Sequence, residues 1–213
     1  MRHIDPERRL LAIALAALAG FVDASGFVGH GGYFLSFMSG NTTRLAVDLA
    51  GAGPSALVPA GIIASFVGGV ALGTAWADRA QGRKRKALLL VAVGLALWAA
   101  AWADGHGLPG PAIAAMASAM GALNTTFQRD GEVAIGLTYM TGALVKIGQG
   151  LGGWLGGHRR AGWNGWAALW SALASGGLAG AVLALRAPWC TGWLAGGWAL
   201  LAAAQAHRIS RKT

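Results

Sequence analysis

The sequence has few charged residues and almost no cysteine. Only 12% of its 213 residues are charged, whereas a soluble domain of this length carries roughly 25%. Cys190 stands alone, so an intrachain disulfide is excluded, and no Cys/His spacing typical of a zinc site is present. The histidines fall near expected helix ends or in loops, with no two at ligand spacing; they are His3, His30, His106, His158 and His207. We therefore expect no metal and no cofactor.

The motifs that carry common enzyme chemistries are also absent. The sequence contains no HExxH, no GxSxG and no P-loop. We therefore expect that the protein is not an enzyme. Its net charge of +9 does not indicate nucleic acid as a partner, because the basic residues form short clusters between long apolar runs. Such clusters are typical of the cytoplasmic loops of membrane proteins.

Apolar residues and glycine dominate the chain. Hydrophobic residues make up 55% of it, and 35 residues are glycine, which in an apolar chain indicates closely packed helices. A membrane-spanning helix needs about 20 apolar residues, with a range of about 17–25. Eight segments of this length predict an all-α polytopic membrane protein in the lipid bilayer; they are Leu10–Val28, Gly32–Gly51, Ala56–Trp76, Ala87–Ala103, Pro111–Gln128, Val133–Gly153, Trp166–Leu185 and Trp189–Ala206. GxxxG pairs occur at Gly69/Gly73, Gly176/Gly180 and Gly192/Gly196, although so many glycines also produce this spacing by chance.

A nine-residue pattern occurs twice. Phe37–Leu45 returns as Tyr139–Ile147, with an aromatic residue, Met, a hydroxyl residue and Gly in the same order, followed by a cation and an aliphatic residue. Met38 and Met140 are 102 residues apart, as are the starts of the fourth and eighth segments. The shared offset indicates duplication, so we expect one membrane domain built from two repeats, 1–106 and 107–213.

The basic residues favour one topology over another. If all eight segments cross the membrane, 8 bases lie inside and 7 outside, which is no bias. If the second and sixth segments re-enter and return to their own side, 14 lie inside and only Arg186 lies outside. We therefore predict six transmembrane helices plus two re-entrant or broken segments in an inverted repeat. Both termini would be cytoplasmic, at the bacterial inner membrane. Full crossing of the two segments stays open.

The first copy of the repeated pattern is polar at a position where a helix break is expected. Gly40 tolerates backbone angles at which one helix ends and another begins, and the residues around it are good N-cap types. A half-helix starting here would present backbone N–H groups and a positive dipole end at membrane depth. We expect substrate to bind at both copies, more strongly at the first; the residues are Ser39, Gly40, Asn41, Thr42, Thr141 and Gly142. A plain helix with glycine used for packing is the alternative.

Four further residues are unusual for membrane depth. Arg44 and Lys146 occupy equivalent positions, and a cation at the centre of a membrane helix costs about 2.5–3.5 kcal/mol on insertion scales. We expect them to attract an anionic or zwitterionic substrate, with snorkelling, or an Arg44–Asp48 pair, as the alternative. Asp23 is expected either to carry a coupling proton or to neutralise a cation. Its counterpart Asn124 is expected to bind substrate or to form an interhelical hydrogen bond.

Four motifs resemble those of the YoaK-like family of small bacterial inner-membrane proteins. They are Gly20–Ala24, Met38–Thr42, Met120–Asn124 and Tyr139–Gly142, and the likeness runs from about residue 10 to 206. The resemblance implies an inner-membrane location and a polytopic fold, and it implies no reaction. It marks as motif positions Asp23, Gly40, Asn41, Thr42, Asn124, Thr141, Gly142 and Lys146.

Taken together, these patterns predict a transporter or channel-like permease for a small anionic or zwitterionic solute, with Asp23 as the candidate proton carrier. Inverted repeats with broken helices place transport sites at the repeat interface, near the bilayer midplane. The alternative is a non-transporting membrane protein that binds or assembles with a partner. Homo-oligomerisation is left open.

Overall fold

The structure of the protein, a computed structural model, describes residues 5–51, 54–79, 82, 84–129, 132–133, 137–138, 140–158 and 162–212. Each of the eight apolar segments contains a helix, so the all-α prediction is confirmed, with one two-residue antiparallel strand pair added. The helices are α1 (Pro6–Gly29), α2 (Met38–Ala50), α3 (Leu57–Arg79), α4 (Arg85–Gly105), α5 (Pro109–Asn124), α6 (Met140–Leu155), α7 (Trp163–Arg186) and α8 (Thr191–Lys212). The short elements are η1 (Pro54–Ala56), η2 (Thr125–Phe127), β1 (Gln128–Arg129), β2 (Glu132–Val133) and η3 (Pro188–Cys190).

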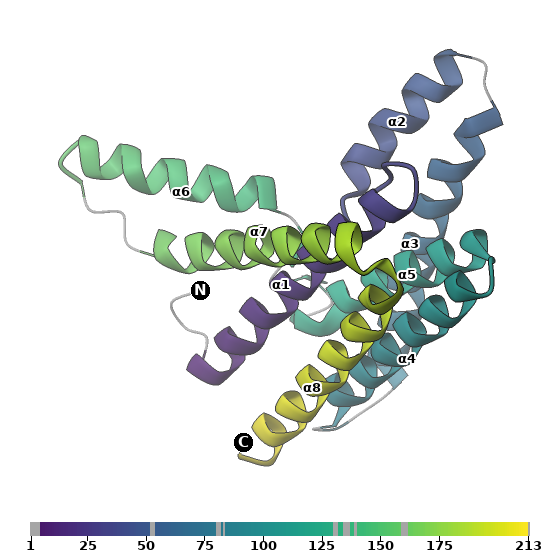
Figure 1. Cartoon of the computed structure of the whole chain (residues 1–213). Coiled ribbons are helices and arrows are strands. Elements are labelled where there is room, and N and C mark those ends of the chain that lie inside the picture. The colour runs from purple at the N-terminus through teal and green to yellow at the C-terminus, as the bar shows by residue number, and fades with distance from the viewer. Residues whose placement is uncertain are drawn as a thin grey trace.

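Helix α1 runs through the middle of the molecule (Figure 1). Its leucines Leu11, Leu15 and Leu18 are buried in one core cluster that includes residues of α4, α5, α7 and α8. The first and last helices meet at one end of the molecule, where the ammonium group of Lys212 donates to the carboxylate of Glu7. The start of α1 and the end of α8 therefore lie on the same side.

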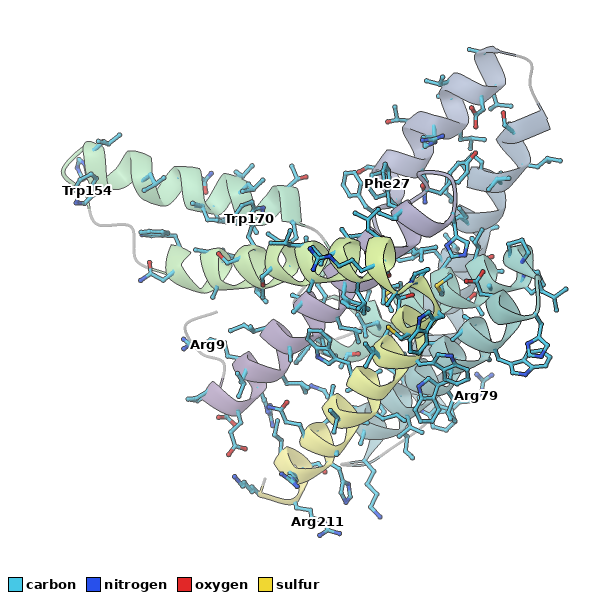
Figure 2. All side chains as sticks on the ribbon, in the orientation of Figure 1. Arg9, Phe27, Arg79, Trp154, Trp170 and Arg211 are labelled. Carbon is cyan, nitrogen blue, oxygen red and sulfur yellow. The ribbon has the colours of Figure 1, made fainter. Side chains whose placement is uncertain are left out.

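The outer surface of the helices is apolar. Within the described residues, α1, α3, α4 and α7 are long and apolar enough to cross a membrane, as judged by length and composition. Leu72 and Leu178 on two of these helices are 73% and 68% exposed. Trp154, at the far tip of α6 in Figure 2, is also 68% exposed. Side chains of this kind suit contact with lipid.

Glycines bring two helix pairs into backbone contact. On α7, a Cβ at Gly176 would lie 2.0 Å from the carbonyl oxygen of Ala17 on α1. On α3, a Cβ at Gly69 would lie 2.0 Å from the carbonyl oxygen of Ser118 on α5. No side chain fits at either distance, so the close packing that the GxxxG spacing predicted is present. Both contacts are of one kind, because a helix glycine faces a backbone carbonyl of the neighbouring helix in each.

Helices α4 and α8 make a third backbone contact, which is reciprocal. A Cβ at Gly94 would lie 3.0 Å from the carbonyl oxygen of Gly196, and a Cβ at Gly196 would lie 2.9 Å from that of Gly94. These glycines are 102 residues apart, the offset that also separates Met38 from Met140. The side chains beside the two glycines differ, since a Cβ at Gly94 would also meet Leu200 and a Cβ at Gly196 would also meet Trp98.

The breaks in the second and sixth segments lie earlier than the sequence predicted. After α1, Gly31 and Gly32 take positive φ angles of 70° and 78°, and the chain turns back without helical structure until Met38. Gly40 therefore lies in the first turn of α2, and the prediction of a break at Gly40 was wrong. Its role is to make room, because a Cβ there would lie 2.7 Å from the ring of Phe37. Likewise Gly142 lies in the first turn of α6.

The paired helices α2–α3 and α6–α7 project from the centre in different directions (Figure 1). Helices α2 and α6 have their N-termini near the middle of the molecule and end far from it. The two first turns are close together, since residues of both line one cavity.

Candidate substrate site at the first turns of α2 and α6

Asp23 holds the segment that leads into α2. Its Oδ1 accepts the backbone N–H groups of Leu35 and Ser36 at 2.7 and 2.6 Å, and its Oδ2 accepts the Ser36 hydroxyl at 2.6 Å. Because Asp23 lies inside α1, these bonds fix the returning segment against the C-terminal third of that helix. The carboxylate thereby determines where α2 begins.

Asn41 adds a second clamp. Its Oδ1 accepts the backbone N–H of Phe34 at 3.0 Å, and its Nδ2 donates to the Phe34 carbonyl at 2.6 Å. The side chain is fully buried, so both ends of the amide are used by the fold. Thr42 is exposed and donates to the carbonyl of Met38 on its own helix at 2.9 Å. Neither Asn41 nor Thr42 lines either of the two cavities described below, so the structure does not support their predicted contribution to substrate binding.

The second copy has a similar anchor. Asn124, at the end of α5, accepts a hydrogen bond from the Thr138 hydroxyl at 3.2 Å and donates to the carbonyl of Met120 at 2.9 Å. Asn124 follows Asp23 by 101 residues, and Thr138 follows Ser36 by 102. In both copies, therefore, a polar residue of the preceding helix holds a hydroxyl residue that stands two positions before the next helix.

The first turns of α2 and α6 share a cavity of about 240 Å³. Its polar lining consists of hydroxyl groups from both copies and of the helix starts; the residues are Ser36, Ser39, Thr138, Thr141 and Gly142. Helix α2 has no side-chain hydrogen bond at its N-cap residue Phe37. Its first N–H groups therefore lack a side-chain cap at this end, where the helix dipole is positive.

A larger cavity of about 470 Å³ adjoins the first. The two share Phe37, Thr138, Met140 and Thr141 as lining residues. The larger one is mostly apolar and adds Asp23, so the carboxylate that anchors the returning segment also borders the space.

The two cations lie away from both cavities. Arg44 donates to the carbonyl of Gly32 at 3.0 Å and stacks over the ring of Tyr33, with its guanidinium carbon 4.5 Å from the ring centre. It therefore stabilises the turn after α1 instead of pairing with Asp48. Lys146 is exposed on α6 and lines neither cavity.

Of the residues proposed from the sequence, the structure brings four to the cavities: Asp23, Ser39, Thr141 and Gly142. Gly40, Asn41, Thr42, Arg44 and Asn124 instead shape or anchor the segments around them. Sequence reasoning missed Ser36 and Thr138. A signal for both was present, since each is a hydroxyl residue two positions before Met38 or Met140.

Comparisons with known proteins agree with the membrane architecture. Residues 11–205 match the family described as protein of unknown function (DUF1275). A UPF0700 transmembrane protein of Rhizobium meliloti (strain 1021) is 38% identical over 202 residues, which cover 95% of this chain and 87% of that protein. No solved structure matches the chain. The resemblance to a family of uncharacterised membrane proteins, which the four motifs indicated, is confirmed.

Proposed function

The chain belongs to the DUF1275 family and is a multi-pass transmembrane protein, and from this premise we propose that it is a permease for a small anionic or zwitterionic solute, with no enzymatic activity. The observation that carries the proposal is the cavity shared by the first turns of α2 and α6. Two helix N-termini meet at this space, whose lining combines hydroxyl groups with the apolar side chains of Phe37, Met38, Phe66 and Met140. Helix N-termini favour negative charge. The alternative role, as a partner-binding subunit, gives no reason for such a space.

The proposed architecture is an inverted repeat of six transmembrane helices, with α2 and α6 re-entering from opposite faces. The matched glycine contacts support it, because α7 meets α1 as α3 meets α5. The reciprocal contact of Gly94 and Gly196 lies where a two-fold axis between the halves would pass. Transporters built in this way hold their substrate at the repeat interface, near the bilayer midplane. The termini would face the cytoplasm across the bacterial inner membrane.

The charge preference of this site comes from the helix ends and the hydroxyl groups. Arg44 donates a hydrogen bond to the carbonyl of Gly32 and stacks over the ring of Tyr33. Lys146 is exposed and lines neither cavity. We therefore expect that neither cation contacts the bound solute. Backbone N–H groups at the start of α2 and the hydroxyls of Ser39 and Thr141 supply the donors.

Asp23 is the proposed proton carrier. Its carboxylate borders the larger cavity and accepts three hydrogen bonds from Leu35 and Ser36. A protonated carboxyl is a weaker acceptor, so protonation would loosen the segment that ends at the first turn of α2. Asn124 has the matching place and does not titrate, so the cycle would involve one proton.

Solute flux tests the binding site. Proteoliposomes would be assayed for uptake of formate, phosphate and glycine, with glycerol as the neutral comparison. Losing one hydrogen bond to a charged group costs about 1.5–3 kcal/mol, so Ser39→Ala and Thr141→Val should each reduce anion flux about tenfold or more. Thr42→Ala and Thr43→Ala are matched controls, because these exposed hydroxyls bond within α2 and line neither cavity. Equal flux in all four variants, or no flux in any protein, would contradict the proposal.

Topology tests the architecture separately. In a Cys190→Ser background, Ser55→Cys and Gly82→Cys would be labelled in intact cells with an impermeant thiol reagent. Both positions are exposed. Labelling at position 55 alone is expected if α2 returns to the outer face. Labelling at position 82 alone would mean that the second segment crosses fully, and the inverted repeat would be lost.

A further inference from the structure

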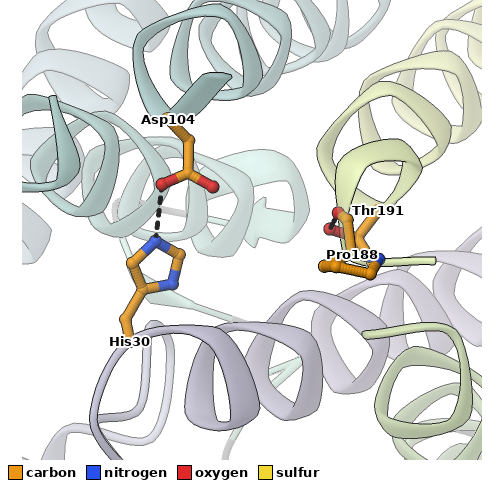
Figure 3. Close-up of polar contacts among 4 residues, drawn as sticks. All are labelled: His30, Asp104, Pro188 and Thr191. Carbon is orange, nitrogen blue, oxygen red and sulfur yellow. Dashed lines mark hydrogen bonds and ion pairs between the residues drawn. The ribbon is translucent and has the colours of Figure 1, made fainter. Parts of the chain in front are cut away.

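A third cavity lies at the opposite side of α1 from the proposed transport site. Its volume is about 350 Å³, and it is bordered by the C-terminal ends of α1 and α4 and by the start of α8. None of its lining residues is shared with the two cavities described above. In Figure 3, His30 and Asp104 stand across from Pro188 and Thr191, and all four line this cavity.

An ion pair lies at its border. The carboxylate Oδ1 of Asp104 is 3.2 Å from His30 Nε2, and the Asp104 and His30 side chains are 50% and 11% exposed. Within the described part of the chain, the contact with His30 uses Oδ1 of Asp104, and half of the Asp104 side chain stays exposed. His30 Nδ1 is buried without a hydrogen bond to the described residues.

Three tryptophans line the same cavity as this carboxylate. Trp102, Trp189 and Trp193 all line the cavity, and Trp189 is 79% exposed. Indole faces attract cations with about 0.5–1 kcal/mol at exposed sites and more when water is excluded. A half-exposed carboxylate and several indole rings that line one cavity are the usual chemistry for holding an organic ammonium group.

We propose that this cavity binds a primary ammonium group, through the half-exposed carboxylate of Asp104 and the tryptophan rings. Its Thr191 hydroxyl is already used by the Pro188 carbonyl at 2.9 Å, so the carboxylate is the main polar contact. His30 is a positioning residue, since it holds Asp104 at the cavity. The ammonium group belongs either to a free amine or to a phosphatidylethanolamine headgroup, and the two sources share this chemistry.

Calorimetric titration of the purified, full-length protein in phosphatidylglycerol nanodiscs tests the proposal with benzylammonium as the probe. Benzyl alcohol is the neutral comparison and should not bind. Asp104→Asn should weaken binding at least about tenfold, and Trp189→Leu about two- to fivefold. Asp78→Asn is the matched control, since Asp78 is exposed on α3 and does not line this cavity. Because Trp189 is so exposed, its replacement tests the site even if the Asp104 variant fails to fold.

Nanodiscs that contain phosphatidylethanolamine separate the two sources. Weaker binding of benzylammonium in these discs identifies the lipid headgroup as the occupant, and unchanged binding identifies a free amine. Both results require the probe to bind in phosphatidylglycerol discs. The proposal is overturned if benzyl alcohol binds as tightly as benzylammonium, or if Asp104→Asn and Trp189→Leu both bind the probe like the wild type.

Discussion

The segments that lead into α2 and α6 share one plan and differ in their side chains. Asp23 and Asn124 occupy matching places, and each accepts a hydrogen bond from a hydroxyl residue, Ser36 or Thr138. The carboxylate of Asp23 also accepts two backbone N–H groups. Since a neutral amide suffices in the second copy, the anchor requires an acceptor and not a charge. The charge of Asp23 is therefore available for another purpose, which we assign to proton coupling.

The two copies also differ one turn into the helix. Asn41 clamps Phe34 through both ends of its amide, whereas the equivalent position in α6 is Ala143, which is buried and offers no hydrogen bond from its side chain. Among the described residues, the first copy thus has two side-chain anchors and the second has one. If the permease opens by moving one of the two first turns, α6 is expected to move more easily than α2.

Removing each anchor should give the largest contrast between the copies. Asp23→Ala leaves three donors without their acceptor, and a buried unsatisfied group costs about 1–3 kcal/mol, so we expect a loss of about 3 kcal/mol or more in unfolding free energy. Asn124→Ala removes one such acceptor and should cost about 1–2 kcal/mol. Chemical unfolding in detergent, followed by tryptophan fluorescence, measures both. Equal losses would remove the distinction between the copies.

The charge of Asp23 can be tested apart from its anchoring. Asp23→Asn reproduces the second copy's amide in the first copy, so the fold should be kept with a loss of about 1–2 kcal/mol. Solute uptake driven by a pH gradient should be lost, while exchange of solute without a gradient should continue. Uptake that still responds to the gradient would exclude Asp23 as the proton carrier.

Two glycine substitutions should have opposite effects on stability. A Cβ at Gly176 meets the Ala17 carbonyl oxygen at 2.0 Å, so Gly176→Ala should destabilise by about 1–3 kcal/mol through overpacking. Nothing lies within 4 Å of a Cβ at Gly142, so Gly142→Ala should be neutral or stabilise by about 0.5–1 kcal/mol, because alanine favours helix. Since Gly142 lines the smaller cavity, we expect reduced flux in this stable variant. Thermal unfolding and flux, measured on the same preparations, check both statements.

The second clamp gives an intermediate effect. Asn41→Ala removes two hydrogen bonds to Phe34, each worth about 1 kcal/mol, so a loss of about 2 kcal/mol is expected. Amide hydrogen exchange should then rise in the first turn of α2 toward the level in α6. No change in the exchange of α2 would mean that Asn41 is not the cause of the difference between the copies.

The smallest effects are expected at the cations. Lys146→Gln changes an exposed residue outside the cavities, so unfolding free energy should stay within about 0.5 kcal/mol and anion flux should be unchanged. Arg44→Gln loses the contacts with Gly32 and Tyr33 and should cost about 1 kcal/mol. A strong loss of flux in Lys146→Gln would restore the charge role that the sequence indicated.

Much of the fold could be predicted from the sequence because its causes are local. Helix length follows from apolar runs, and the offset between Met38 and Met140 is visible in the order of residue types. The start of α2 was missed because it depends on Asp23, which lies twelve residues before Leu35 and bonds to it across a turn. The contacts of Arg44 with the turn were missed for the same reason, because its partners, Gly32 and Tyr33, lie in the returning segment.

The sequence predicted where the candidate site lies better than it predicted which residues line it. The repeated pattern pointed to the starts of α2 and α6, and these do meet at one cavity. Polarity alone does not distinguish a side chain that lines the cavity, such as Ser39, from one that hydrogen-bonds to the backbone, such as Asn41. That distinction depends on which face of the first helical turn packs against Phe34.

The contact between Gly94 and Gly196 has a consequence for the ancestry of the chain. Each glycine meets the carbonyl of the other at nearly the same distance, so under the proposed inverted repeat this backbone contact does not require the two halves to be covalently joined. A half-length ancestor that inserted into the bilayer in both orientations could have paired with itself through this surface before gene fusion. Fusion would then have freed each copy to diverge, and the proposed repeat relates the carboxylate of Asp23 to the amide of Asn124 in this way.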